Sequence, residues 1–212
     1  VKLIPLLILP IFLKQLGLRR MIAYSAVSAM VVLILGKLFL NETFLLNLLG
    51  SIDQYFGRFE FNAGIFYVIR EIGFWINGYD PIQTIGPLFT RIILISVILL
   101  AVFRKYRSDQ DLFTGALFAF LIFYGFSTTV HPWYISMVLI FSIFTQYRFG
   151  LIWSLLVMLS YSAYQSEVFT ENKYYLLTEY LVLGIVILWE LRKFRRADLA
   201  DFQWSKILGR KE

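Results

Sequence analysis

Long blocks of apolar residues alternate with short polar segments along the whole chain. A helix needs about 20 apolar residues to cross the roughly 30 Å hydrocarbon core of a bilayer, and most blocks approach that length. The pattern therefore predicts an all-α, polytopic transmembrane helical bundle. Its seven predicted spans cover residues 3–18, 21–40, 85–103, 112–128, 132–147, 149–165 and 175–191.

The fourth and fifth blocks are separated by only a brief polar stretch, from Ser127 to His131. A single helix over 112–147 would extend about 54 Å, which exceeds the thickness of the bilayer. Pro132 also disfavours an unbroken helix, because proline lacks the backbone donor that a helix interior needs. We therefore expect two helices here.

The composition favours a membrane protein over a soluble domain. Of the 212 residues, 59% are hydrophobic and only 16% are charged, whereas soluble domains carry about a quarter charged residues. The net charge of +6 does not indicate nucleic-acid binding, because the basic residues form short clusters instead of one continuous face. With no cysteine and a single histidine, the chain is expected to hold no disulfide, zinc or other metal.

Basic residues follow every second apolar block. The clusters comprise Lys14, Arg19 and Arg20, then Arg104, Lys105 and Arg107, then Arg148, and finally Arg192, Lys193, Arg195 and Arg196. The positive-inside rule places these connections in the cytoplasm and the segments 41–84, 128–133 and 166–174 outside. The chain then divides into a transmembrane domain, residues 1–191, and a basic cytoplasmic tail, residues 192–212, expected to anchor the last helix at an anionic leaflet.

The chain begins with Val1, inside the first apolar block. Two early prolines, Pro5 and Pro10, and the lack of a basic leader argue against a signal peptide. We expect the sequence to be the C-terminal part of a longer protein.

Residues 62–76 of the outer segment have the pattern of an amphipathic helix lying in the membrane interface. Its apolar side chains recur every three or four residues, at Ile65, Val68, Ile69, Ile72 and Ile76. Gly64 and Tyr67 fall on roughly the opposite side. Asn62 is a suitable N-cap for this helix, and the turn residues at 77–81 are expected to end it.

Ionisable and aromatic residues are mixed in the preceding run, SIDQYFGRFEFN. Aromatic rings stack on sugar faces, and carboxylates accept hydrogen bonds from sugar hydroxyl groups. The ionisable residues are Asp53, Arg58 and Glu60, and the aromatic ones are Tyr55, Phe56, Phe59 and Phe61. The alternative is a surface ion pair of Arg58 with Glu60 or Asp53, which contributes little to stability.

The only histidine, His131, lies in the string STTVHPWY at the outer mouth of two predicted spans. Ionisable residues at membrane depth are functional candidates, and a protonated imidazole can hold a phosphate. The alternative is that His131 caps a helix end while Trp133 and Tyr134 are interfacial aromatics. The spans carry few ionisable residues and no Asp/Glu/His chain of the kind that proton-coupled transporters use.

Three strings together resemble the polytopic GT-C glycosyltransferases, in particular the bacterial polyprenyl-phosphate-mannose-dependent mannosyltransferases. They are KLIPLLILP at 2–10, FEFNAGIFYVIR at 59–70 and TTVHPWYI at 128–135. The order of the three strings carries the resemblance. It implies a multi-pass protein of the bacterial cytoplasmic membrane with a cytoplasmic C-terminus.

The resemblance also implies transfer of a sugar, expected to be mannose, from a polyprenyl phosphate to a glycan or lipid acceptor on the outer face. No cofactor besides this donor is implied. The catalytic carboxylate of such enzymes lies in an early outer loop that has no counterpart here, so the catalytic residue is expected upstream. The two rival functions are a lipid or polysaccharide flippase and a non-catalytic membrane scaffold.

The implied substrate-binding residues lie in the three matching strings. Lys2 would meet the donor phosphate, and His131 would contact the same phosphate or the leaving group. Trp133 and Tyr134 would stack on the sugar or the polyprenyl chain. The residues that would position donor or acceptor are Arg58, Glu60, Asn62 and Arg70.

Overall fold

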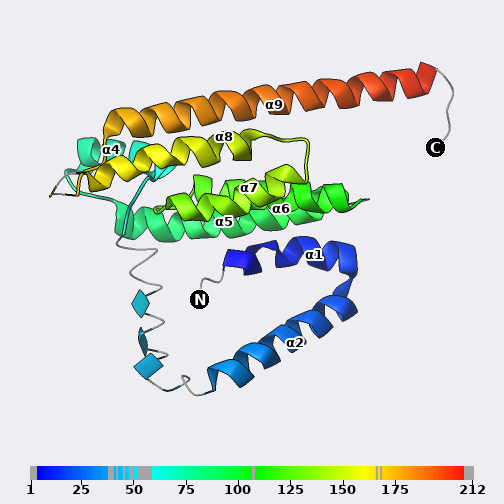
Figure 1. Ribbon diagram of the computed structural model, residues 1–212, viewed down its shortest axis with the longest axis horizontal. Coiled ribbons are helices and arrows are strands. Elements are labelled where there is room, and N and C mark those ends of the chain that lie inside the picture. The colour runs from blue at the N-terminus through cyan, green and yellow to red at the C-terminus, as the bar shows by residue number, and fades with distance from the viewer. Residues whose placement is uncertain are drawn as a thin grey trace.

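The computed structural model describes residues 4–37, 41, 43–44, 46–47, 50–51, 59–106, 108–165, 167 and 169–207. Within these residues the chain is helical and forms no β-strand (Figure 1). The α-helices are α1 (Leu9–Leu16), α2 (Leu18–Gly36), α4 (Gly64–Asn77), α5 (Ile82–Phe103), α6 (Asp109–Gly125), α7 (Ile135–Ile143), α8 (Phe149–Leu156) and α9 (Lys173–Ile207). The 3₁₀ helices are η1 (Ile4–Ile8), η2 (Pro132–Tyr134) and η3 (Val157–Tyr164).

Three helices of the described chain have the length and apolar composition needed to cross a membrane: α2, α5 and the Lys173–Lys193 part of α9. The described parts of the other predicted spans are also helical but shorter. The all-α prediction is therefore confirmed, together with three helices suited to a membrane. The number of seven spans stays a prediction.

The predicted break between the fourth and fifth spans is confirmed. Helix α6 ends at Gly125, and the next helical turn begins at Pro132. The start of α6 is fixed by a capping box, in which Ser108 accepts from the Asp111 N–H and Asp111 accepts from the Ser108 N–H. This box satisfies donors that a helix N-terminus otherwise leaves unpaired.

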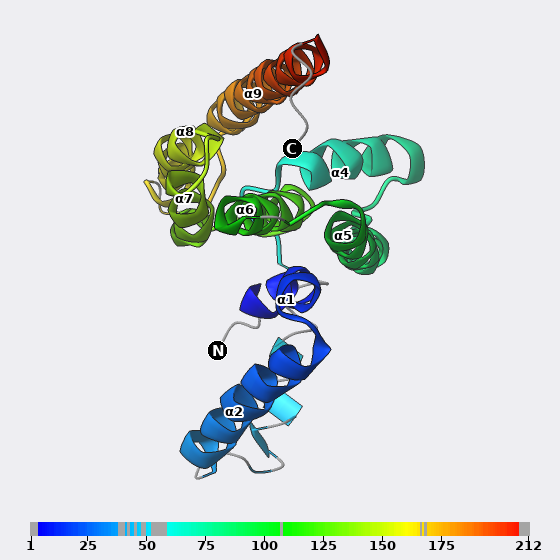
Figure 2. The same ribbon diagram turned by 90° about the vertical axis from the view of Figure 1, so that its right-hand side faces the viewer.

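Helix α6 lies at the centre of the bundle, between α5 and α7 (Figure 2). Its Phe120 and Tyr124 are buried and belong to one apolar core with Ile135 of α7 and Trp153 of α8. The rings of Tyr124 and Trp153 meet edge to face at 6.4 Å. Because α6 packs on several sides, it presents no single apolar stripe, as expected of a central helix.

Helix α2 turns away from this bundle at Gly17 (Figures 1 and 2). Gly17 has a φ of 78°, a conformation that glycine adopts without steric cost. No residue of α2 is buried, although the helix is strongly apolar. Its apolar surface is thus turned outward on all sides.

Helix α4 occupies the predicted position, and the side that it turns toward the protein lies opposite most of its apolar stripe. The buried residues of α4 are Phe66, Tyr67 and Gly73. Val68 and Ile72 of the apolar stripe are exposed, whereas Tyr67, assigned to the opposite side, faces the protein. The apolar stripe therefore points away from the bundle.

The predicted capping role of Asn62 is wrong. Helix α4 begins at Gly64, its N-cap is Ala63, and no side chain caps it. Asn62 has a left-handed φ of 48° and its side chain is directed into the protein. The tertiary contacts of this residue override its local preference.

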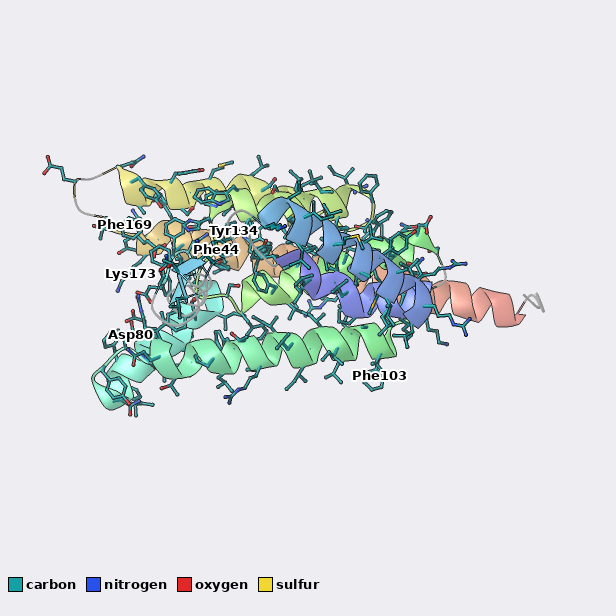
Figure 3. All side chains as sticks on the ribbon, turned by 90° about the horizontal axis from the view of Figure 1, so that it is seen from below. Phe44, Asp80, Phe103, Tyr134, Phe169 and Lys173 are labelled. Atoms are coloured by element: carbon teal, nitrogen blue, oxygen red, sulfur yellow. The ribbon has the colours of Figure 1, made fainter. Side chains whose placement is uncertain are left out.

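The connections of the bundle gather at two ends. The end formed by 59–81, 126–134, 163–165 and 169–173 is called the loop-rich end below. Figure 3 shows Asp80, Tyr134, Phe169 and Lys173 toward this end and Phe103 at the other. At the opposite end, Lys14 donates to the carbonyl groups of Val102 and Arg104 at the close of α5.

Candidate functional site

Two of the sequence strings, 70 residues apart, are joined at the loop-rich end. The Phe61 N–H donates to the Thr128 carbonyl at 3.0 Å, and the Val130 N–H donates to the Phe61 carbonyl at 2.8 Å. The Thr129 hydroxyl donates to the Phe59 carbonyl at 3.0 Å. These bonds form an isolated parallel bridge that fixes the FEFN segment against the HPWY turn.

An aromatic group surrounds His131 beside this bridge. The imidazole stacks on Trp133 with ring centroids 4.4 Å apart and planes 8° apart. Phe61 packs at 4.8 Å from the same ring, and Phe59 lies at 6.0 Å. Phe59 and Trp133 are 40% and 54% exposed, so the group presents an aromatic surface outward.

Tyr134 differs from its neighbour Trp133. It is 5% exposed and its ring stacks on Tyr124 in the core. Trp133, unlike Tyr134, is exposed enough to be an interfacial aromatic or to contact a ligand. His131 stands at the N-cap position of η2, as the alternative reading expects, but its side chain makes no cap hydrogen bond there.

Glu60 and Arg70 form an ion pair between the bridge segment and α4. The Arg70 guanidinium also lies over the Tyr67 ring, 4.3 Å from its centroid. Partial burial raises the pKa of the Glu60 carboxyl, while the positive charge of Arg70 acts in the opposite direction. The pair couples α4 to the bridge, and it is a different pair from those expected with Arg58.

Asn62 connects the bridge to α9. Its side-chain amide donates to Glu179 Oε1 at 3.1 Å, and its carbonyl accepts from the Tyr180 hydroxyl at 2.5 Å. Trp153 Nε1 donates to the same Glu179 oxygen at 2.9 Å. Asn62 and Glu179 are 1% and 0% exposed, so this network lies inside the protein.

A second carboxylate, Glu171, lies next to this network. It accepts from the Asn62 N–H at 2.7 Å and from the Tyr67 hydroxyl. Burial raises the pKa of Glu171, and these two hydrogen bonds oppose the rise. Burial, reinforced by the charge of Glu171, raises the pKa of the Tyr67 hydroxyl.

A small pocket of about 10 Å³ opens between α9, η3 and the bridge. Its lining includes Asn62, Ser160, Ser162, Glu171, Asn172 and Glu179. A cavity of this size holds about one water molecule. It can bind a small polar species but not a sugar ring.

The structure thus brings together six of the predicted site residues: Glu60, Asn62, Arg70, His131, Trp133 and Tyr134. Four others lie outside the described residues: Lys2, Asp53, Tyr55 and Arg58. Their expected contacts stay predictions. Within the described part of the chain, no group of three His, Asp or Glu side chains could hold a metal ion.

The sequence reasoning missed the buried carboxylates Glu171 and Glu179. Glu179 stands within the seventh apolar block, where a charge is costly and therefore functional by default. The position of Glu179 inside an apolar block could therefore have identified it as a candidate. The spans as a whole carry few ionisable residues, and this one was not singled out. Glu171 gave no comparable signal, because acidic residues are ordinary in loops.

Comparisons with known proteins leave the family open. No protein-family model, curated protein or solved structure matches this chain.

Proposed function

We propose that this chain belongs to a membrane glycosyltransferase that moves a sugar, expected to be mannose, from a polyprenyl phosphate to a glycan or lipid acceptor. The observation that carries the proposal is the backbone bridge between Phe61 and Thr129. It unites the FEFN and HPWY segments, two of the three strings that resemble the GT-C enzymes.

The chemistry of the loop-rich end suits such a substrate. The exposed rings of Phe59 and Trp133 offer faces for a sugar or for isoprene units. A protonated His131 beside them would stabilise phosphate charge as it develops on the leaving group. The Arg70 guanidinium provides a second cation on the neighbouring helix, although Glu60 neutralises it in part.

The apolar stripe of α4 gives the site a route to a lipid substrate. Val68, Ile72 and Trp75 are exposed beside the site, and Trp75 is 88% exposed. An outward apolar helix face next to polar groups is typical of helices that lie in a membrane interface. We infer that a long polyprenyl chain approaches the site along this surface.

The orientation belongs to the same proposal. The loop-rich end would face outward and the basic end would face the cytoplasm of a bacterial cell, with seven spans and a cytoplasmic C-terminus. Since the chain has no cysteine, single-cysteine variants at Asn77 and Lys105, both exposed, can test this. In intact cells, an impermeant thiol reagent should label only the Asn77→Cys variant, and the reverse pattern would contradict the orientation.

The activity is tested with the complete protein in membrane vesicles supplied with radiolabelled polyprenyl-phosphate mannose and acceptor lipids. We expect His131→Gln and Trp133→Ala to reduce transfer roughly tenfold or more, because each removes a group at the reacting phosphate or sugar. Trp189→Ala is the matched control, since Trp189 is 60% exposed on α9 but lies away from the loop-rich end. Equal transfer by all variants at equal membrane content would contradict the proposal and favour a scaffold.

A further inference from the structure

Two buried oxygen atoms at the pocket have no hydrogen-bond donor among the described residues: Glu179 Oε2 and Asn62 Oδ1. The two residues are 0% and 1% exposed, and both line the same pocket. A buried acceptor without a donor is uncommon and costs free energy. Both atoms are acceptors, so the missing partner is either a donor or a positive charge.

The charges around the pocket indicate which partner fits. Trp153 and Asn62 both donate to Glu179 Oε1, so Oε2 is the oxygen that remains for a further partner. The carboxylate of Glu171 lines the same pocket, and Arg70 is the cation that attracts Glu171. Arg70 is also paired with Glu60, so it does not balance Glu171 and Glu179 by itself, and uncompensated negative charge is costly inside a protein.

We propose that this pocket binds a single monovalent cation of about the size of sodium. Its oxygen ligands would be Glu179 Oε2, Asn62 Oδ1 and a carboxylate oxygen of Glu171. Hard cations prefer such carboxylate and amide oxygens, and the pocket volume of about 10 Å³ matches one small ion. Among the described residues no third acidic or histidine side chain joins these ligands, which disfavours a divalent ion.

Ser160 supplies a further oxygen at the pocket. Its hydroxyl donates to the Val157 carbonyl at 2.7 Å, so the lone pairs of Oγ remain available to a cation. Ser160 belongs to η3, a 3₁₀ continuation of α8, and such segments often accompany functional sites. The ligands then come from three separate parts of the chain.

The bound cation would link two segments of the loop-rich end and stabilise their arrangement. Asn62 holds a left-handed conformation directly after Phe61, which forms the bridge to Thr129. A cation shared by Asn62 and Glu179 holds this backbone against α9. It therefore stabilises the arrangement of the bridge and of the aromatic group around His131, whatever reaction occurs there.

Trp153 is a built-in reporter, because its indole is buried and donates to Glu179. The remaining tryptophans, Trp75, Trp133, Trp189 and Trp204, are replaced by phenylalanine in the full chain. At constant ionic strength, exchanging choline chloride for NaCl should then change the Trp153 emission in a saturable way. KCl should act more weakly because the larger ion fits the pocket less well.

Three variants test the assignment. Glu179→Gln should abolish the sodium response, and Glu167→Gln, at an exposed loop carboxylate, should leave it intact. Asn62→Asp adds a further carboxylate to the pocket and should shift the preference toward Ca²⁺. A sodium response retained in Glu179→Gln would overturn the assignment.

A second measurement needs no substitution at the site. The thermal midpoint of the unaltered protein should rise with NaCl relative to choline chloride, since a ligand that binds only the folded state stabilises it. Equal midpoints and equal emission in the two salts would overturn the proposal, as would a response to pH alone. The outcome is independent of the transfer assay, so failure of one proposal does not decide the other.

Discussion

Two glutamates of α9, Glu179 and Glu190, are equally buried but are used in different ways. Both oxygens of Glu190 accept backbone N–H groups at the start of α8, from Arg148 at 2.7 Å and from Phe149 at 3.2 Å. Glu179 has one oxygen bonded twice and one oxygen without a donor beside a pocket. Burial alone therefore does not distinguish a structural carboxylate from a binding one.

The difference lies in the donors that meet each carboxylate. A helix N-terminus offers several unpaired N–H groups in parallel, which together satisfy a carboxylate completely. The side-chain donors of Asn62 and Trp153 both reach the same oxygen of Glu179. Glu190 is consequently closed by hydrogen bonds, whereas Glu179 keeps an oxygen available for a ligand.

The largest effect is expected from Glu190→Ala. The change removes the acceptor of the buried Phe149 N–H and of the partly buried Arg148 N–H, and it should destabilise the protein by about 3 kcal/mol. The measurement is unfolding of the purified protein in detergent micelles. Glu167→Ala, at an exposed glutamate, is the control, and equal stability of the two variants would show that the capping role is wrong.

Gly64→Ala should have the next largest effect. A Cβ at this position would lie 2.4 Å from the Tyr180 ring, so the ring must move and its bond to the Asn62 carbonyl is strained. We expect a loss of about 2 kcal/mol, as for other overpacked sites. Unfolding in micelles measures it, and Ile65→Ala on the exposed stripe should change stability far less. A neutral Gly64→Ala would mean that the loop-rich end is loosely packed.

Glu179→Gln should change stability less than either, by about 1 kcal/mol or less in the absence of sodium. The amide keeps an acceptor for Trp153, and its NH₂ group can donate to Asn62 Oδ1, which otherwise has no donor. The same unfolding measurement in choline chloride checks this value. A loss of stability as large as that of Glu190→Ala would mean that Glu179, like Glu190, is a structural carboxylate.

The smallest effect is the pH dependence at Glu171. The pKa of Glu171 is raised in the folded state, so folding favours the protonated carboxyl. The folded protein gains the full stabilisation below pH 4.5, the ordinary pKa of this carboxyl. That stabilisation is lost as the pH rises through the raised value. As the pH rises above 4.5, thermal midpoints should therefore shift in favour of Glu171→Gln relative to the parent. A constant difference between variant and parent would contradict the shift.

The sequence alone determined the helical segments and their main break. Apolar blocks of helical length predicted the all-α bundle, and the turn chemistry near Pro132 separated α6 from the next helix. The existence of α4 was also readable from its periodicity. These features are local, because a few neighbouring residues set the backbone preference.

The tertiary structure alone decided which face of α4 is buried and what Asn62 does. Periodicity identifies an apolar stripe but not its partner, and here Tyr67 turns inward to Glu171 while the stripe faces outward. The bond of Asn62 to Glu179 joins residues 117 positions apart. Such contacts depend on how distant segments pack together, and for that reason no local pattern in the sequence contains them.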